Sequence, residues 1–153
     1  MPTIELAFHC EAITPAAAFD RIQDFESYPR YTEAVVSVDI EDNDPHAVIS
    51  VWTVRFRKGL LRWTERDDIR RDVATIDFCQ VSGDFKTFQG SWRVREEEQG
   101  ATIVYFTAEF DLGMPSLAEL LDPIAAAALA ENIELILGGL FGAVRQVDPT
   151  IAA

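Results

Sequence analysis

The sequence is poor in the residues from which disulfide frameworks, metal sites and catalytic triads are built. Its 153 residues include two cysteines, Cys10 and Cys79, which are too few and too far apart for a disulfide framework or a zinc site. Its two histidines, His9 and His46, have no partner at the spacing of a metal site or a triad. We therefore expect no metal centre and no disulfide, and we expect both thiols to be buried in the core.

Cofactor motifs and long hydrophobic runs are also missing. There is no G-x-G-x-x-G pattern, no phosphate-binding glycine loop and no nucleophile elbow, so we expect no bound cofactor. The apolar run from Ile124 to Ala130 stops at Glu131, well short of the roughly 18 residues that span a membrane. The first residues, Met-Pro-Thr-Ile-Glu, lack the basic and apolar regions of a signal peptide. A cytoplasmic location is the expectation.

Basic residues are few and unevenly placed. The chain has 13 Lys and Arg against 26 Asp and Glu, a net charge of −13, which argues against non-specific binding to nucleic acid or to anionic membranes. Seven of the 13 lie in one stretch: Arg55, Arg57, Lys58, Arg62, Arg66, Arg70 and Arg71. This stretch either faces an acidic partner or is balanced by nearby acids such as Asp68 and Asp72.

Hydrophobic periodicity predicts an α+β fold in a single domain over residues 1–153. Thr14 followed by Pro15 is typical of a helix start, with a capping side chain before a first-turn proline. The predicted order is one strand, two short helices, six strands and one long helix. Strands are predicted around residues 3–10, 35–41, 88–94 and 102–112, short helices over 15–23 and 24–29, and the long helix from Pro115-Ser116 almost to the C-terminus.

Two hairpins between the second strand and Phe78 can be given a register. A turn at Lys58-Gly59 places Trp52 opposite Glu65, and a turn at Arg71-Asp72 places Glu65 opposite Phe78. Both registers put Trp63, Glu65 and Asp67 on the apolar face of the middle strand. The same register puts Arg55, Arg62 and Arg66 on the outward face, with Arg55 and Arg62 directly opposed.

Glu65 and Asp67 are the candidate catalytic residues. They lie two apart on one strand, so their carboxyl groups share a face about 6–7 Å apart along it. Beside indole and alkyl groups, and beside each other, one of them can hold a proton near neutral pH and deliver it as a general acid. The alternative is that both acids lie at an open rim and pair with arginines, since buried unpaired acids are rare.

Several segments of the chain resemble the polyketide cyclase/dehydrase and coenzyme Q-binding family of START-like, helix-grip proteins. The matching segments are Asp24-Phe25-Glu26-Ser27-Tyr28-Pro29, Gly83-Asp84-Phe85 with Gly90-Ser91-Trp92, Glu109-Phe110-Asp111 and Ala130-Glu131-Asn132-Ile133. The resemblance implies a seven-stranded antiparallel sheet curved around the C-terminal helix, with an internal hydrophobic cavity. It also implies that Trp63 and Trp92 line that cavity. The chain departs from the cyclases at Glu65 and Asp67, where they carry serine and arginine, and at Ala108, where they carry glutamine.

Aromatic side chains are the candidate ligand contacts. The predicted ligand-binding residues are Trp52, Trp63, Phe78, Phe88, Trp92, Phe106 and Phe110, with Asn132 on the long helix and Tyr28 and Tyr31 at the entrance. Each aromatic residue has plain core packing as its alternative role, and Asn132 has a structural bond to backbone as its alternative. Gly90 among these aromatics predicts an indentation in the sheet.

The resemblance favours a polyketide cyclase or dehydratase that closes a hydrophobic poly-carbonyl chain by aldol chemistry. An acyl carrier protein is then the acidic partner expected at Arg55, Arg62 and Arg66. The alternative is a carrier without catalysis, binding a quinone, isoprenoid or lipid. A ribosome-binding toxin, which the family also includes, is disfavoured by the net charge of −13. Acids inside the cavity favour the enzyme, whereas acids at the rim favour the carrier.

Overall fold

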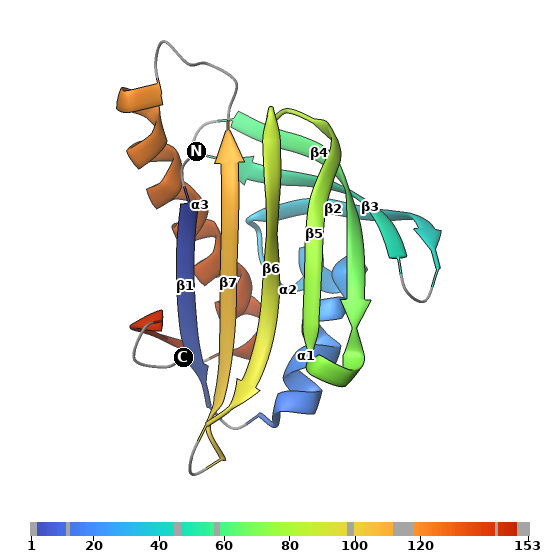
Figure 1. Ribbon diagram of the computed structural model, residues 1–153, viewed down its shortest axis with the longest axis vertical. Helices are drawn as coiled ribbons and strands as arrows, with labels where there is room; N and C mark the ends of the chain where they lie inside the picture. The colour runs from blue at the N-terminus through green and yellow to red at the C-terminus, as the bar shows by residue number, and fades with distance from the viewer. Residues whose placement is uncertain are drawn as a thin grey trace.

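The fold is one antiparallel sheet of eight strands that curves around helices on its inner side (Figure 1). The computed structural model describes residues 3–11, 13–44, 47–56, 59–97, 100–111, 118–142 and 144–149. The strand order across the sheet is β2-β3-β4-β5-β6-β7-β1-β8. The strands are β1 (Thr3–Cys10), β2 (Val35–Asn43), β3 (Ala47–Phe56), β4 (Gly59–Arg70), β5 (Thr75–Gly83), β6 (Thr87–Glu96), β7 (Thr102–Asp111) and β8 (Val144–Val147).

Helices α1 (Pro15–Gln23), α2 (Tyr28–Tyr31) and the long α3 (Ala118–Phe141) lie on one side of this sheet, with the 3-10 turn η1 (Phe25–Ser27) between α1 and α2. A second 3-10 turn, η2 (Arg71–Val73), connects β4 to β5. Thr14 caps α1 as predicted, because its hydroxyl accepts a hydrogen bond of 3.2 Å from the backbone N–H of Ala17. The α+β class, the order of elements up to α3 and the curved sheet are confirmed. The predicted start of the long helix at Pro115-Ser116 lies outside the described residues.

An eighth strand at the C-terminal end was not predicted. Helix α3 ends at Phe141, and Gly142 has φ 77°, the left-handed conformation that commonly terminates helices. The N–H of Gly142 bonds to the carbonyl of Gly138 at 2.9 Å, and the chain then turns back to pair β8 with β1. The predicted helix, which ran almost to the C-terminus, is therefore too long, because Gly142 ends it after Phe141.

The two predicted hairpin registers are each wrong by two residues. Trp52 lies opposite Trp63 rather than Glu65, and Asp67 lies opposite Phe78. The second connection is longer than the predicted two-residue turn, since η2 ends in Ala74 with φ 47°. Because side chains alternate with a period of two, a shift of two residues leaves every side chain on its predicted face. Arg55 and Arg62 share the outward face but are not directly opposed, since their partners are Leu60 and Thr53.

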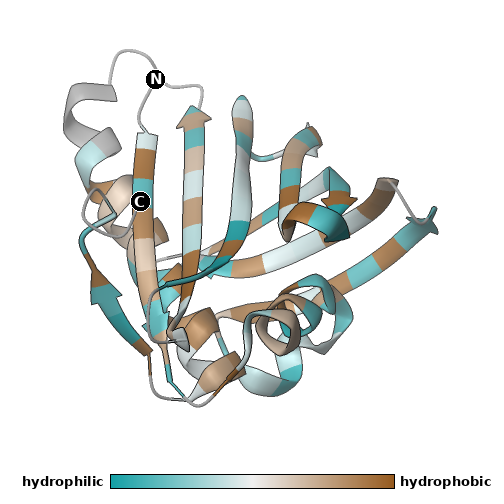
Figure 2. Ribbon diagram, turned by 60° about the horizontal axis from the view of Figure 1, so that its bottom comes forward, coloured by the Kyte–Doolittle hydropathy of each residue, from teal (hydrophilic) through white to brown (hydrophobic). Residues whose placement is uncertain are grey.

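The core lies between the inner face of the sheet and the helices. Figure 2 shows hydrophobic and hydrophilic residues alternating along the strands, and α3 contributes buried Leu129, Ile133, Ile136, Leu137 and Leu140. Within the described residues, no helix is long and apolar enough to cross a membrane.

The two cysteines differ in burial. Cys10 is buried, and this burial raises the pKa of its thiol to about 11. Cys79 is exposed, so the expectation of two buried thiols is wrong for this residue. The reason is strand alternation, because its neighbour Phe78 occupies the inner face of β5.

Two adjacent glycines of α3 provide a matched test of how this helix packs. A Cβ atom at position 139 would lie 2.1 Å from the carbonyl oxygen of Tyr31, whereas a Cβ at 138 meets nothing within 4 Å. Gly139→Ala is expected to lower the free energy of unfolding by about 1–3 kcal/mol through overpacking against α2. Gly138→Ala is expected to raise it by up to about 1 kcal/mol, because alanine favours helix. Urea denaturation of both variants checks this, and equal effects would contradict the close packing.

Candidate functional site

A small apolar cavity lies between the inner face of the sheet and α3. Its volume is about 60 Å³. It is lined by Tyr28, Trp52, Val54, Trp63, Glu65, Phe78, Phe88, Trp92, Phe106, Leu129, Asn132, Ile133 and Ile136. Small-molecule pockets usually measure roughly 300–1,000 Å³. A ligand of more than a few atoms must therefore displace side chains or separate α3 from the sheet.

Aromatic rings fill most of the space between these elements. Trp52 and Trp63 lie opposite each other on β3 and β4 and stack with centroids 6.0 Å apart and planes 1° apart. Phe88 meets Trp63 edge-on at 5.3 Å. Phe106 stacks on Phe78 at 5.7 Å. Each of these pairs adds stability beyond the area it buries, about 0.5–1.5 kcal/mol.

Gly90 does not leave the indentation that the sequence predicted. A Cβ atom at this position would lie 2.8 Å from Cζ of Phe78 and 2.0 Å from the carbonyl oxygen of Thr107. The ring of Phe78 therefore lies over Gly90 and fills the space that the missing side chain leaves.

Glu65 lines the cavity and is almost fully buried, with 5% of its surface exposed. The indole N–H of Trp63 donates a hydrogen bond of 2.6 Å to its Oε1. The neighbouring arginines of β4 point to the outer face, where Arg66 pairs with Asp68 and Arg70 pairs with Asp77. In the described part of the chain Glu65 therefore has no basic partner.

Asp67 is fully buried next to Glu65 but is not among the residues that line the cavity. The hydroxyl of Ser50 donates a hydrogen bond of 2.6 Å to Oδ2 of Asp67, and Ser50 in turn accepts one of 2.9 Å from the indole N–H of Trp52. The other oxygen, Oδ1, is buried and has no hydrogen-bond partner among the described residues. Ser50 thus holds Asp67 in place through Oδ2 alone.

Burial controls the protonation of both acids. It raises the pKa of Glu65 well above its ordinary value, and the adjoining Asp67 raises it further. Burial also raises the pKa of Asp67, while its interactions with Glu65 and Ser50 act in the opposite direction. Both carboxyl groups are therefore harder to ionise in the folded protein than in the unfolded chain.

The remaining predicted residues take different positions. Tyr28 lines the cavity and donates its hydroxyl to the carbonyl of Ile22, and burial followed by the nearby Asp67 raises its pKa well above the ordinary value. Tyr31 is 53% exposed and does not line the cavity. Asn132 lines it and makes the structural bond considered above, donating to the carbonyl of Arg55 at 2.6 Å. Phe110 is buried in the core away from the cavity lining.

Sequence reasoning did not single out Ser50 or the apolar residues of α3. The signal for Ser50 was available, because it alternates with Trp52 and Val54 on the inner face of β3. A buried hydroxyl needs polar partners, and Asp67 and Trp52 supply them.

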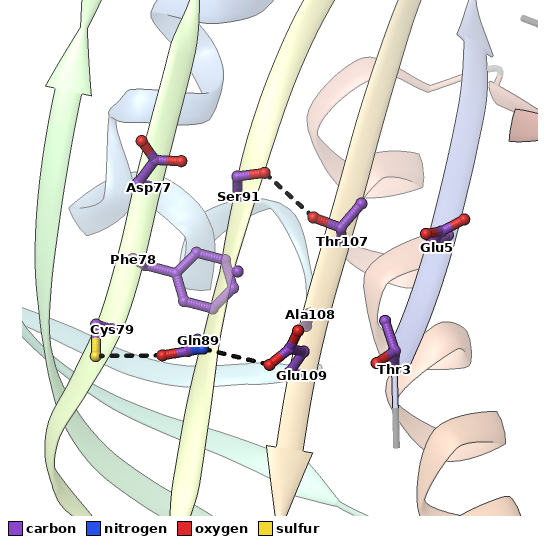
Figure 3. Close-up of a pocket in the computed structure, with 11 residues that line it drawn as sticks. Thr3, Glu5, Asp77, Phe78, Cys79, Gln89, Ser91, Thr107, Ala108 and Glu109 are labelled. Atoms are coloured by element: carbon purple, nitrogen blue, oxygen red, sulfur yellow. Dashed lines mark hydrogen bonds between the residues drawn. The ribbon is translucent and has the colours of Figure 1, made fainter. Parts of the chain in front are cut away.

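A separate polar groove of about 440 Å³ crosses the outer face of β1, β7, β6 and β5 (Figure 3). Its side chains bond to one another, as Ser91 does with Thr107 at 3.2 Å and Gln89 with Glu109 at 3.3 Å. Across the described residues, no three His, Cys, Asp or Glu side chains lie close enough together to hold a metal ion. The cavity with its two buried acids is therefore the candidate site.

The raised pKa values predict how stability depends on pH. In the unfolded chain, Glu65 and Asp67 ionise near 4.5 and 3.8, but the folded protein resists ionising them. At a pH below these two values, both groups are protonated in the folded and the unfolded protein, and they do not reduce stability. As pH rises toward the raised pKa values of the folded protein, the free energy of unfolding falls by up to about 1.4 kcal/mol per pH unit per group. Glu65→Gln should gain stability relative to the parent protein as pH rises.

Glu5→Gln is the control, because Glu5 is exposed on the outer face of β1. Urea unfolding of the three proteins from acid to mildly alkaline pH measures both differences. A difference between Glu65→Gln and the parent that stays constant with pH would show that Glu65 titrates normally.

Comparisons with known proteins agree with this fold. Residues 12–135 match the family described as polyketide cyclase / dehydrase and lipid transport. A comparison with curated proteins gives no match. Among solved structures, a protein from Thermus thermophilus is similar with a TM-score of 0.83 and 23% identity, covering 92% of this chain and 95% of that one.

Two further structures carry informative names. The Zhui aromatase/cyclase from Streptomyces has a TM-score of 0.81 and 15% identity, covering 92% of each chain. A START superfamily protein from Mycobacterium smegmatis has a TM-score of 0.77 and 15% identity, covering 92% of this chain and 94% of that one. At these identities the likeness shows the helix-grip fold alone, which is the fold that the resemblance implied. The family match extends over most of the chain, so the protein belongs to the polyketide cyclase / dehydrase and lipid transport family.

Proposed function

We propose that the protein binds a hydrophobic carbonyl compound in the aromatic cavity and promotes its aldol cyclisation and dehydration by acid–base catalysis. The observation that carries this proposal is Glu65, a buried acid on the wall of a mostly apolar cavity, with the buried Asp67 beside it. Acids held in such surroundings are suited to proton transfer near neutral pH. The family, and the aromatase/cyclase among the similar structures, support this chemistry.

The two carboxyls act as one unit with a single proton. When Glu65 holds the proton, it can donate to a ligand carbonyl oxygen. When the proton passes to Oδ1 of Asp67, which has no partner among the described residues, the Glu65 carboxylate becomes a base facing the ligand. Ser50 and Trp63 keep the two groups in place during this exchange.

The proton balance of the reaction closes on this pair. The Glu65 carboxylate removes a proton from the carbon between two carbonyls, and the resulting enolate carbon bonds to a second carbonyl carbon. The protonated Glu65 then returns that proton to the new alkoxide oxygen, giving a β-hydroxy ketone. The Glu65 carboxylate then takes a second α proton and gives it to the departing hydroxyl, which leaves as water while the carbon–carbon double bond forms. The aromatic wall keeps bulk water away from the carbonyls.

Glu65→Gln tests the catalytic role with a simple reaction. A neutral aryl 1,3-diketone in deuterium oxide exchanges the hydrogens between its carbonyls, and NMR follows the rate. The substitution keeps an acceptor for Trp63 but removes the titrating group, so the enzyme-dependent rate should fall by about 10²–10⁴-fold. Glu5→Gln should exchange the diketone at the parental rate, and a parental rate in Glu65→Gln would exclude Glu65 as the acid–base group.

The second candidate is a carrier that binds its ligand without turnover. It is favoured by the apolar character of the rest of the cavity wall and by the lipid transport in the family description. Native mass spectrometry of freshly purified protein would detect a retained quinone, isoprenoid or lipid. A retained ligand together with no diketone exchange by the parent protein would favour the carrier.

We also propose an acyl carrier protein as the partner of the outward face of β3 and β4. Arg55 donates to the backbone carbonyl of Glu33 at 3.0 Å, and Arg66 pairs with Asp68 at 3.2 Å. The guanidinium of Arg62 is exposed and has no bonding partner among the described residues. Arg62 is therefore the group best placed to meet an acidic surface.

Charge reversal tests this surface. Arg62→Glu should weaken binding to a holo acyl carrier protein by about tenfold or more at low salt, with a smaller effect at high salt, where such contacts are screened. Arg145→Glu, at an exposed arginine of β8 on the far edge of the sheet, is the matched control. Equal binding by the two variants in calorimetric titrations would exclude the proposed surface.

A further inference from the structure

Among the described residues, the polar end of the cavity carries the acid Glu65, with Asp67 beside it, and no base. Among the described residues that line the cavity, none is a lysine, arginine or histidine. Other charged groups that act on this end are acids as well, since Asp68 acts on Asp67, and Asp24 acts on Tyr28. The arginines of β4 lie on the opposite face, where Arg66 and Arg70 have acidic partners. A negative charge brought into this end of the cavity therefore meets no compensating charge from the part of the chain that the structure describes.

The hydrogen-bond donors around the acids are already used. The indole of Trp63 donates to Glu65, and that of Trp52 donates to Ser50. The hydroxyl of Ser50 donates to Asp67. The phenol of Tyr28 donates to the backbone carbonyl of Ile22. What remains for a ligand beside the acids is a proton on Glu65. Elsewhere on the lining, the second amide N–H of Asn132 and the indole N–H of Trp92 have no partner among the described residues, and both are neutral donors.

Sites that bind anions differ from the polar end of this cavity. Carboxylates and phosphates are bound by guanidinium or ammonium groups or by several converging N–H donors. A neutral carbonyl needs only one donor, and the proton of Glu65 supplies it. A protonated amine needs acceptors and is also attracted to aromatic faces such as those of Trp52 and Trp63.

We infer that the cavity selects its ligand by charge: it admits a buried end that is uncharged or cationic and rejects carboxylates and phosphates. This inference rests on the proposed function only in placing the ligand beside Glu65. It narrows the substrate class to compounds whose buried end is a ketone, quinone, ester or amine. Free fatty acids and prenyl diphosphates cannot bind with their charged ends beside the acids.

Three probes with one ring and one head group test this selectivity. Benzyl alcohol, benzylamine and benzoate are titrated at neutral pH, with binding followed by tryptophan fluorescence and calorimetry, since Trp52, Trp63 and Trp92 all line the cavity. Benzyl alcohol should bind at least about tenfold more tightly than benzoate, and benzylamine at least as tightly as the alcohol. Benzoate binding as tightly as the alcohol would overturn the inference. Failure of both benzyl alcohol and benzylamine to bind would overturn it as well.

Variants identify the groups responsible. Asp67→Asn, and Asp67→Asn combined with Glu65→Gln, should bring benzoate and benzyl alcohol to similar affinities, because the buried negative charge is gone. Glu5→Gln on the outer face should keep the parental selectivity. If a folded Asp67→Asn protein kept the parental ratio of affinities for benzyl alcohol and benzoate, the buried acids would not be the cause of the selectivity. The measurements on the parent protein decide the inference even where a variant does not fold.

The outcome is separable from that of the proposed function. Selectivity is measured by binding and catalysis by deuterium exchange of the diketone. Charge selectivity without exchange would refute the catalytic proposal and leave the inference standing. Deuterium exchange of the diketone without charge selectivity would refute the inference and leave the catalytic proposal standing.

Discussion

The alternation of side chains along β4 determines what the cavity contains. Arg62, Arg66 and Arg70 point outward, whereas Trp63, Glu65 and Asp67 point inward, and one strand cannot bring the two sets together. The acids are therefore separated from the nearest arginines by the thickness of the sheet. Inside, their partners are an indole, a hydroxyl and each other. The protonation of the pair and the charge selectivity of the cavity both follow from this separation.

Burying two acids in this way opposes folding. An unpaired buried carboxylate is costly, and proteins commonly respond by keeping such a group protonated. Hydrogen bonds from Trp63 to Glu65 and from Ser50 to Asp67 offset part of the penalty, at about 1.5–3 kcal/mol each where the acceptor is charged. The aromatic packing around them contributes the rest of the local stability. Trp63 therefore stabilises the fold and orients the acid with the same side chain.

Much of the fold could be predicted because periodicity survives errors in turn geometry. The hairpins on both sides of β4 were placed two residues out of register, yet Trp63, Glu65 and Asp67 kept their predicted face. Features set by a single backbone conformation could not be predicted. Ala74 in a left-handed conformation lengthens one turn, and Gly142 ends α3 early enough for β8 to form.

The residues of the candidate site could be predicted better than the size of its cavity. Alternation identified the aromatic residues of the wall, but no sequence pattern reports how closely rings pack, so the small volume of the cavity was not foreseen. Tyr31 was expected beside Tyr28, but the two side chains differ greatly in exposure, with Tyr28 buried and Tyr31 mostly exposed. On a helix as short as α2, periodicity gives no basis for telling them apart.

The central claim is that Glu65 carries a proton in the folded protein at neutral pH. Isotope-edited infrared spectroscopy, with glutamate labelled in its side-chain carboxyl, measures this directly. We predict a carbonyl band of a protonated carboxyl at neutral pH that is present in the parent protein and absent from Glu65→Gln. A spectrum at neutral pH that contains only carboxylate bands would contradict the account.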